Sequence, residues 1–402
     1  MSIKKLPKDE LKTIRSIYNL PEATRNGIAD SIGLSILKTS TLLNDLERKE
    51  VIQKTGKTKS SSGRPSYIYD LFPASSFSVG ITFKLDHFHA VIVDAQKRII
   101  QDKTYPFDRG GPKQIEIEAI VNTINGIIQS LLKDIPADKS MALTAGISVP
   151  GMIDTEGKTW LLGLQAGGIR HYPLAQEVEK KAGLPVFIED NARSVTYYEK
   201  LIGSCTNLRN YVVLYLGSGV GTGIVTNGEL YRGTRGLAGE LGHIVHYNNT
   251  YRCSCGNVGC LETVLTPHGI RRIILDRIDE GVVSKLSNMN RENITIESIL
   301  EAANNADQPT RNTLFEIGTF LGDACTMIIG LFNPQKIVIT GKTVTLKDYL
   351  YEPTMQRINQ RVLPEMREGV DVAFTDYRDN LEPLGVALFS FDQYMNVSVH
   401  EK

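Results

Sequence analysis

Residues 239–262 read GELGHIVHYNNTYRCSCGNVGCLE, and this stretch decides how the rest of the 402-residue sequence is interpreted. Three of the chain's five cysteines fall within eight residues, and a histidine stands ten positions before the first of them. Zinc prefers four thiolate and imidazole ligands arranged as a tetrahedron. The spacing therefore predicts a structural zinc site that leaves no ligand position for a catalytic water. The predicted ligands are His243, Cys253, Cys255 and Cys260.

The same stretch leaves two alternatives open. His246 could supply the nitrogen ligand in place of His243, or the three cysteines could be buried thiols that bind no metal. Gly256 and Gly259 favour the metal site, because glycine lets the backbone turn tightly enough for the cysteines to converge. Clustered cysteines of this kind are typical of metal sites.

Composition is that of a soluble globular protein with two or three domains, since 402 residues exceed one ordinary core. Lys plus Arg and Asp plus Glu are 45 each, so the net charge of the whole chain indicates no partner. Residues 1–72 nevertheless hold 13 basic and 8 acidic residues, which is typical of a nucleic-acid-binding module on an acidic body. We expect no signal peptide, no apolar stretch of membrane-spanning length and, with Cys205 and Cys325 isolated, a reducing cytoplasmic location.

Residues 1–72 are predicted to form a winged helix-turn-helix domain. Apolar residues at helical spacing predict helices over residues 8–19 and 25–31, and Ser35 is a good N-cap for a third helix that reaches about residue 49. Two β-prone runs, 51–53 and 67–69, flank a loop with four positive charges and no acid. Such a loop is typical of a wing that lies along DNA phosphates.

The candidate DNA contacts lie on the outer face of the third helix and on this basic loop. Gly63 and Pro65 flank Arg64, so that its side chain could enter a narrow minor groove. A small helical domain with a solvated basic loop would share part of this pattern, but the order of helix, turn, capped helix and basic hairpin favours DNA binding. The predicted DNA-binding residues are Ser35, Lys38, Ser40, Thr41, Lys54, Lys57, Lys59 and Arg64.

From residue 78 onward the sequence alternates between strand and helix patterns, which predicts an α/β body. Its length suggests two lobes, residues 73–190 and residues 191–402. The second lobe is expected to carry the zinc loop and to end in a C-terminal return to the first lobe. The strands are predicted at 78–82, 89–93, 142–149, 186–189, 211–216 and 336–340, and the helices at 114–133 and 191–201.

Polar side chains gather around the zinc stretch and at the end of one predicted strand. Carboxylates, amides and imidazoles suit sugar hydroxyls, which both donate and accept hydrogen bonds, although the two glutamates could instead be surface or supporting groups. Residues 217–223, GSGVGTG, could offer backbone N–H groups to a phosphate or could be a plain tight turn. The predicted sugar-binding residues are Asp190, Asn191, Glu240, His243 and Glu262.

Together these motifs resemble those of the ROK family, which contains repressors and sugar kinases, over nearly the whole chain. GELGH at 239–243 with CSCGNVGCLE at 253–262 matches the family signature, and GISVPGMID at 146–154 resembles its Gly-x-x-x-Pro-Gly-x-x-Asp turn. The resemblance implies an actin-like, ribonuclease H-like body of two lobes with the sugar in its cleft. Family members with an N-terminal winged helix are sugar-responsive transcription regulators, and those without one are usually ATP-dependent sugar kinases.

The sequence departs from the kinase pattern in two places. Kinases of the family carry Asp-x-Gly-Gly-Thr on the first hairpin, where this chain has Thr82-Phe-Lys-Leu-Asp86. They also carry Glu-Asn-Asp-Ala-Asn, whose Asp is the catalytic base, where this chain has Glu189-Asp-Asn-Ala-Arg193. The amide of Asn191 cannot accept a proton, so we predict that the chain is not an enzyme. The family's sugar-holding Asn-Leu is also missing from QAGGI at 165–169, which leaves the sugar unidentified.

The leading hypothesis is therefore a repressor of carbohydrate-metabolism genes whose affinity for an operator changes when a sugar or sugar phosphate binds. A sugar kinase with a DNA-binding domain is the first alternative, and a scaffold that binds a protein partner through the zinc loop is the second. The expected partners are operator DNA, the effector and further copies of the chain in a homodimer or homotetramer, with no membrane.

Overall fold

The computed structural model describes residues 6–59, 65–108, 116–133, 135 and 142–400, which fall into two compact units. Unit 1 comprises Met1–Asp190, Tyr197–Asn207 and Asn380–Lys402, and unit 2 comprises Asn191–Thr196 and Leu208–Asp379. The predicted N-terminal domain and first lobe thus belong to one unit, and the first continuous stretch of that unit ends at Asp190. The boundaries expected at residues 72 and 190 stay a prediction.

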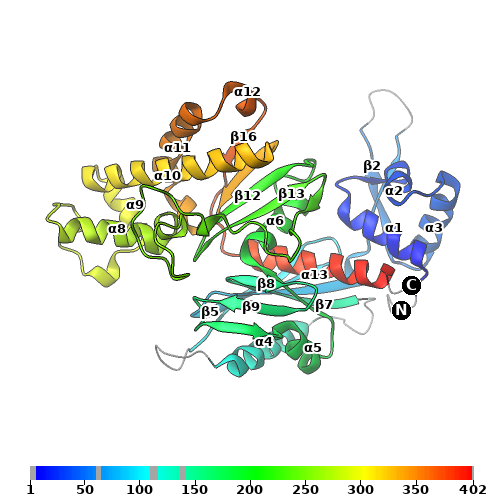
Figure 1. Cartoon of the computed structure of the whole chain (residues 1–402). Coiled ribbons are helices and arrows are strands. Elements are labelled where there is room, and N and C mark those ends of the chain that lie inside the picture. The colour runs from blue at the N-terminus through cyan, green and yellow to red at the C-terminus, as the bar shows by residue number, and fades with distance from the viewer. Residues whose placement is uncertain (1–5, 60–64, 109–115, 134, 136–141, 401–402) are drawn as a thin grey trace. The chain divides into compact units, whose positions relative to one another are not determined.

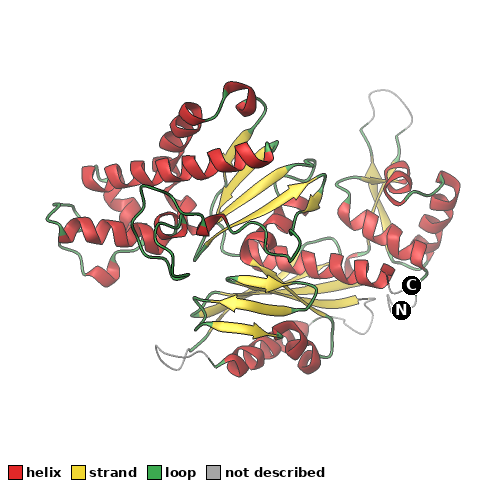
Figure 2. Cartoon of the chain, in the orientation of Figure 1, coloured by secondary structure: helices red, strands yellow, loops and turns green. Residues whose placement is uncertain are grey.

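The N-terminal part of unit 1 consists of three helices and a small antiparallel sheet with the order β1-β3-β2 (Figures 1 and 2). The side chains of Thr24 and Ser35 cap the second and third helices, and Gly33 ends the second in the left-handed conformation with φ of 67°. The three predicted helices are confirmed. The elements are α1 (Lys8–Asn19), β1 (Ala23–Thr24), α2 (Arg25–Ile32), α3 (Ile36–Arg48), β2 (Ile52–Lys57) and β3 (Tyr67–Leu71).

One strand of this hairpin is longer than the sequence predicts. We expected the strand to end at residue 53 and the loop to carry Lys54 and Lys57, but β2 continues to Lys57. A β-bulge between Lys54 and Gly56 lets the pairing with β3 continue. The ammonium groups of both lysines lie over the ring of Tyr67, at 5.2 and 5.0 Å from its centroid, and so cover the hairpin.

The rest of unit 1 is built on a mixed five-stranded sheet with the order β11-β7-β4-β5-β6. Helices α4 and α5 pack on one face, and α13 lies on the other (Figure 1). The elements are η2 (Pro73–Ser75), β4 (Ser76–Phe83), β5 (His87–Asp94), β6 (Ile99–Pro106), α4 (Ile117–Leu132), β7 (Ala142–Val149), a small sheet of β8 (Met152–Asp154), β9 (Thr159–Gly163) and β10 (Ile169–Tyr172), α5 (Leu174–Ala182), β11 (Val186–Asp190) and α13 (Leu381–His400).

Unit 2 repeats the same sheet topology, with the order β14-β13-β12-β15-β16. In both sheets the first three strands in the chain are antiparallel and the last two join in parallel, so the two sheets have equivalent connectivity. The predicted strands at 211–216 and 336–340 are confirmed. The strands are β12 (Tyr211–Leu216), β13 (Val220–Thr226), β14 (Glu229–Leu230), β15 (Lys336–Thr340) and β16 (Asp371–Phe374).

Helices pack against this second sheet and supply most of the apolar core beside it. Helix α6 (Asn191–Leu201) starts in unit 2 and ends in unit 1, since the division falls between Thr196 and Tyr197. The other helices are η4 (Leu241–His243), α7 (Glu262–Leu265), α8 (Pro267–Asp279), η5 (Arg291–Asn293), α9 (Ile296–Asn304), α10 (Gln308–Phe332), η6 (Lys342–Leu346), α11 (Lys347–Arg361) and α12 (Pro364–Arg367).

Helix α10 corrects one expectation from the sequence. We expected no apolar stretch of membrane-spanning length, but this 25-residue helix is long and apolar enough by length and composition. Its most apolar window is 56% buried within the protein. Buried side chains such as Leu314, Leu321 and Ile328 belong to the core of unit 2, which explains the apolar composition of the helix.

Candidate metal centre and ligand site

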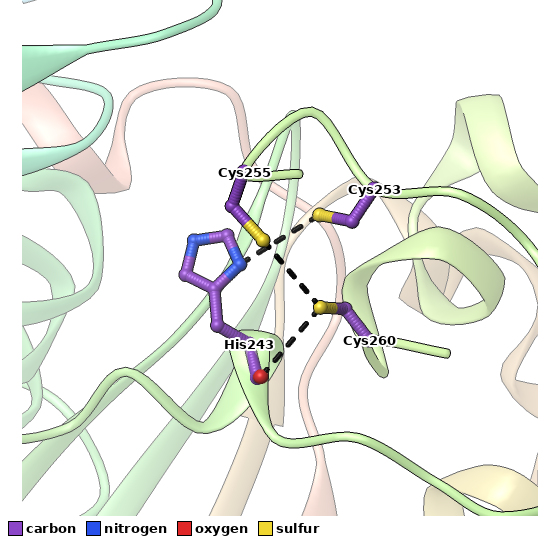
Figure 3. Close-up of side chains that lie close together, drawn as sticks. All are labelled: His243, Cys253, Cys255 and Cys260. Carbon is purple, nitrogen blue, oxygen red and sulfur yellow. Dashed lines mark hydrogen bonds between the residues drawn. The ribbon is translucent and has the colours of Figure 1, made fainter. Parts of the chain in front are cut away.

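The four predicted metal ligands converge in unit 2 (Figure 3). One ligand atom from each of His243, Cys253, Cys255 and Cys260 lies within 4.8 Å of all the others. The sulfurs of Cys255 and Cys260 are 3.6 Å apart, and the sulfur of Cys253 is 3.8 Å from Nδ1 of His243. A tetrahedral zinc ion with bonds of about 2.3 Å to sulfur places its ligand atoms roughly 3.8 Å apart. The spacing therefore fits an ion of this size.

The backbone of the loop brings these ligands together by tight turns. The N–H of Cys253 donates to the carbonyl of Asn257 at 2.8 Å, and residues Val245 and Cys260 form an isolated β-bridge. Gly256 and Gly259 adopt φ of 98° and 91°, a region that favours glycine. A side chain on Gly259 would also lie 2.7 Å from the carbonyl oxygen of Asn249. The turns predicted at the two glycines are confirmed.

The three thiols differ in the direction in which their surroundings shift the pKa. Burial, together with hydrogen bonds to the other two thiols, raises the pKa of Cys260 to about 12, and burial also raises the pKa of Cys253. Burial opposes ionisation of Cys255 as well, but hydrogen bonds from the Asn257 backbone and the neighbouring thiols lower its pKa. This arrangement suits a cation, because a metal ion would replace the protons and stabilise three thiolates at once.

His246, the alternative nitrogen ligand, has another role. Its Nε2 lies 3.0 Å from Oδ2 of Asp323, and its Nδ1 accepts a hydrogen bond from the N–H of Asn248 at 3.3 Å. Arg357 in turn donates to both oxygens of Asp323 at 2.7 and 2.9 Å. His246 therefore anchors the metal loop to α10 and α11, and this anchoring role was not predicted from the sequence.

The segments that carry three of the predicted sugar-binding residues meet at the start of β13. The N–H of Val220 donates to Oε2 of Glu262 at 3.3 Å. The N–H and hydroxyl of Thr222 donate to the carbonyl of Gly239, next to Glu240, at 2.9 and 2.8 Å. Gly221 faces Ala192, which follows Asn191. Strand β13 thus brings together Asn191, Glu240 and Glu262 with the metal loop.

Close backbone packing explains the glycines around Glu240. A side chain on Gly239 would collide with the carbonyl oxygen of Thr222, and one on Gly242 would collide with that of Val220. Gly239 also has φ of 101°. The short helix η4 that begins after Glu240 therefore lies directly against β13, and this contact fixes the direction in which the loop leaves the sheet.

Burial shapes the chemistry of the predicted sugar-binding residues. Burial raises the pKa of Glu262, and one of its oxygens lies 3.9 Å from the sulfur of Cys253, so this carboxylate adjoins the metal centre. Asn191 is 6% exposed and starts α6. Asp190 ends β11 in unit 1 and is half-buried. Arg193, which sequence reasoning assigned no role, donates to the carbonyl of Ala238 at 2.7 Å and ties α6 to the segment before Gly239.

The predicted DNA-contact residues Ser35, Lys38, Ser40 and Thr41 lie at the N-terminal end of α3. The Ser35 hydroxyl caps α3 by accepting from the N–H of Lys38 at 3.3 Å. The hydroxyls of Ser40 and Thr41 donate to the carbonyls of Ile36 and Leu37 at 2.8 and 3.3 Å. Lys38 forms an exposed ion pair with Asp9 of α1.

Leu37 is a surface residue that the site prediction missed. Its side chain is 81% exposed on the same helix as Ser40 and Thr41. An exposed apolar side chain of this kind is suited to contact the methyl group of thymine if the helix is placed in a DNA groove. The signal in the sequence was its position opposite the apolar face of the helix.

Two of the predicted wing lysines are placed on the hairpin, and the rest of the wing is only partly described. Lys54 pairs with Glu47 at 2.8 Å, and the hydrogen bond to this carboxylate raises the pKa of Lys54. Lys57 ends β2, and Lys59 is exposed just beyond it. Arg64 lies outside the described residues.

The first hairpin of the body is filled by side chains. Phe83 is fully buried and packs against Phe88 and Trp160, with ring centroids 4.9 and 6.2 Å apart. Lys84 forms an ion pair of 2.7 Å with Glu382, whose side chain is 3% exposed. Leu85 adopts φ of 67° at the turn, a conformation that glycine would adopt without strain.

Two five-stranded sheets of equivalent topology, with a cysteine-rich loop beside one of them, define a two-lobed actin-like protein. Residues 78–391 match the ROK family, and the chain belongs to this family. A xylose repressor of Bacillus spizizenii is 24% identical over 384 residues, which are 96% of this chain and 95% of that protein. The ROK family and the actin-like fold of the body, both predicted from the sequence, are therefore confirmed.

Solved structures support the same fold. The crystal structure of a ROK family transcriptional regulator, a homolog of the E. coli MLC protein, has a TM-score of 0.80 and 24% identity, covering 98% of this chain and 100% of that chain. A ROK family glucokinase from Streptomyces griseus, solved with glucose and AMPPNP, has a TM-score of 0.67 and 23% identity. It covers 78% of this chain and 99% of its own. The similarity to the regulator thus extends over more of this chain.

Proposed function

We propose that this protein is a sugar-responsive, DNA-binding transcription regulator that represses genes of carbohydrate metabolism. The observation that carries the proposal is the N-terminal arrangement of α1–α3 and the β2–β3 hairpin, joined to a ROK body. The xylose repressor relative spans nearly the same length, N-terminal segment included, which supports this function. The protein acts in the cytoplasm, as a homodimer or homotetramer and without a membrane.

The N-terminal segment acts as a winged helix-turn-helix domain. Helix α3 enters the major groove with Ser35, Lys38, Ser40 and Thr41 at or near base edges and phosphates, and with exposed Leu37 beside them. The ion pair between Lys38 and Asp9 opens when a phosphate replaces the carboxylate. The wing residues Lys54, Lys57, Lys59 and Arg64 contact the DNA backbone and minor groove.

The effector is a sugar or sugar phosphate bound by Asp190, Asn191, Glu240, His243 and Glu262. Its hydroxyls need partners that donate and partners that accept, and these side chains supply both. A structural zinc ion on His243, Cys253, Cys255 and Cys260 holds the loop that carries these groups. His243 directs Nδ1 toward the sulfur of Cys253, so that Nε2 is the atom suited to a sugar hydroxyl.

The kinase alternative is weaker. Phosphoryl transfer depends on phosphates held by close backbone contacts. In this chain Lys84 and Leu85 stand where the kinase pattern has its two glycines, and Lys84 forms an ion pair with Glu382. The neighbouring Phe83 is buried. The glycine-rich turn is also packed, because a side chain on Gly217 would collide with the ring of Tyr215. Asn191 cannot act as a base.

Three assays on one panel of sugars and sugar phosphates test this function. Thermal shift should identify a ligand, and electrophoretic selection from random DNA should identify an operator whose affinity changes when that ligand is added. A coupled assay for ADP should show no turnover with ATP. Steady ADP release that requires the bound sugar and disappears in Asp190→Ala would move the protein to the kinase class.

Calorimetry tests the effector site itself. Glu240→Ala and Glu262→Ala should each weaken binding of the identified ligand by about tenfold or more, since each removes a charged hydrogen-bond acceptor. Glu229→Ala, on the exposed strand β14 of the same unit, is the matched control. Wild-type affinity in both site variants would show that the ligand binds elsewhere.

A further inference from the structure

A buried carboxylate on the C-terminal helix joins two elements that are far apart in the sequence. Asp392 lies on α13 and is 1% exposed. Its Oδ1 accepts hydrogen bonds from Nε of Arg15 at 2.8 Å and from Nδ2 of Asn19 at 2.7 Å. Its Oδ2 accepts from Nη2 of Arg15 at 3.1 Å and from the hydroxyl of Tyr197 at 3.2 Å. Arg15 and Asn19 belong to α1, and Tyr197 belongs to α6.

Aromatic side chains cover this cluster on both sides. Tyr18 of α1 packs edge-on against Phe391 with centroids 4.7 Å apart, and its hydroxyl donates to the carbonyl of Leu388 at 3.4 Å. Tyr197 packs edge-on against Phe389 at 5.0 Å. The Asp392 carboxylate is itself shielded from water, whereas the Arg15 side chain is 33% exposed. Loss of a partner of this buried charge should therefore lower stability.

The carboxylate stays charged in these surroundings. Burial alone would raise the pKa of Asp392, but hydrogen bonds from Arg15 and Asn19 and the positive charge of Arg15 lower it below its ordinary value. Arg15 makes a second contact with α13, since its Nη1 donates to Oδ1 of Asn396, one helical turn beyond Asp392. Helix α1 is therefore bound to α13 by a charged and specific contact.

Helix α6 connects this cluster to the candidate effector site. Its first residue is Asn191, and Tyr197 follows six positions later, which is about 9 Å along a helix axis. Strand β13 and Arg193 hold the first turn of α6 beside the segments of Glu240 and Glu262. Helix α6 runs without a break across the division between the two units, so a shift at Asn191 would reach Tyr197 through the helix backbone.

We propose that Asp392 is the residue that couples the effector site to the DNA-binding segment, because its buried carboxylate accepts hydrogen bonds from both α6 and α1. The proposal rests on the proposed function for the identities of the two sites. When α6 shifts, Tyr197 changes its hold on Oδ2, and Arg15 and Asn19 reorient α1 in response. Asp392 is a positioning residue: it touches neither sugar nor DNA.

Hydrogen–deuterium exchange on the full-length protein tests the link without a ligand or an operator. Tyr197→Phe should speed exchange in α1 by about threefold, although Tyr197 itself lies on α6, because one partner of the shared carboxylate is lost. Arg15→Lys should likewise speed exchange in the second half of α6. Asp392→Asn should speed exchange in both helices by about tenfold or more.

The matched control is Tyr105→Phe, also in unit 1. The Tyr105 hydroxyl is buried and has no hydrogen-bond partner among the residues that the structure describes. Its removal should leave exchange in α1 and α6 unchanged. The proposal is overturned if Tyr197→Phe leaves α1 unchanged, or if Arg15→Lys leaves α6 unchanged. Both substitutions are conservative, so the test stands even if Asp392→Asn does not fold.

Operator binding then separates this proposal from the proposed function. If a sugar from the panel changes operator affinity of the wild type, Tyr197→Phe should reduce that change by about threefold or more and keep sugar affinity within about twofold. An undiminished sugar effect in Tyr197→Phe contradicts the coupling. If no sugar alters operator binding, the proposed function fails, and the exchange experiment still decides whether Asp392 links α6 to α1.

Discussion

Substituting Gly80 with alanine should destabilise unit 1, because helix α13 lies against bare backbone at this position. Gly80 on β4 pairs in register with Gly146 on the neighbouring strand β7. A side chain added at Gly80 would lie 2.8 Å from the carbonyl carbon of Pro383, closer still to its oxygen, and 2.9 Å from Cβ of Ala387. A side chain at Gly146 would meet the carbonyl of Val386 in the same way.

The size of the effect follows from these distances. Ordinary contact for such a carbon begins at 3.4 Å, so the carbonyl carbon of Pro383 must withdraw by about 0.6 Å, and its oxygen, which is closer, by more than that. Backbone atoms cannot rotate out of the way as a side chain can. Overpacking of a core costs about 1–3 kcal/mol, and we expect about 3 kcal/mol for Gly80→Ala. The shift in Tm is then about 6–12 °C for a unit of this size.

Denaturant unfolding followed by tryptophan fluorescence measures this loss. The sequence has one tryptophan, Trp160, which is fully buried in unit 1 and reports on that unit alone. Gly126→Ala is the matched control, since Gly126 lies within α4 of the same unit and an added carbon meets nothing within 4 Å. That control should gain about 1 kcal/mol from helix propensity. A Gly80→Ala protein within about 0.5 kcal/mol of wild type would refute the close packing of α13 on the sheet.

Three further predictions concern the metal, the DNA and the pH dependence of stability. Purified protein should contain about one zinc ion per chain, and Cys253→Ser should lose it while Cys205→Ser keeps it; a fully folded zinc-free wild type would contradict the site. Lys57→Ala should weaken binding to all DNA sequences alike and reduce the salt slope by about one, whereas Thr41→Ala should change preference among operators; equal losses of the same kind in both would contradict the assignments. The lowered pKa of Asp392 means that its stabilisation is present above about pH 4 and is lost as pH falls through the folded-state value. The stability difference between wild type and Asp392→Asn should therefore shrink on acidification below pH ~4, and a constant difference from pH ~6 to ~3 would speak against it.

Local patterns in the sequence were sufficient to predict most elements and the metal cluster. The Ser35 cap, the strands at 142–149 and 211–216 and the helix at 191–201 depend on contacts between residues a few positions apart. The three cysteines are also close in sequence, and glycine turns bring them together within one loop. Such signals can be recognised in the sequence alone, because hydrophobic periodicity, helix caps and turn residues depend only on neighbouring positions.

Contacts between distant residues were decided only by the tertiary structure. The sequence left open whether His243 or His246 faces the cysteines. In the structure His246 pairs with Asp323, which lies 77 positions further along the chain, and His243 faces the cysteines. The apolar composition of α10 could not distinguish a membrane segment from a core helix until the partners of its buried face were known.

The sequence by itself determined the class of body and the four-residue cluster that could hold a metal ion. Only the tertiary structure decided which helix lies against which sheet and which charges are shared. Gly80 lies against Pro383 of α13, which is 303 positions further along the chain, and Asp392 binds Arg15 across 377 positions. No periodicity or spacing encodes such pairs, because they form when loop closure and the burial of apolar faces bring remote segments together.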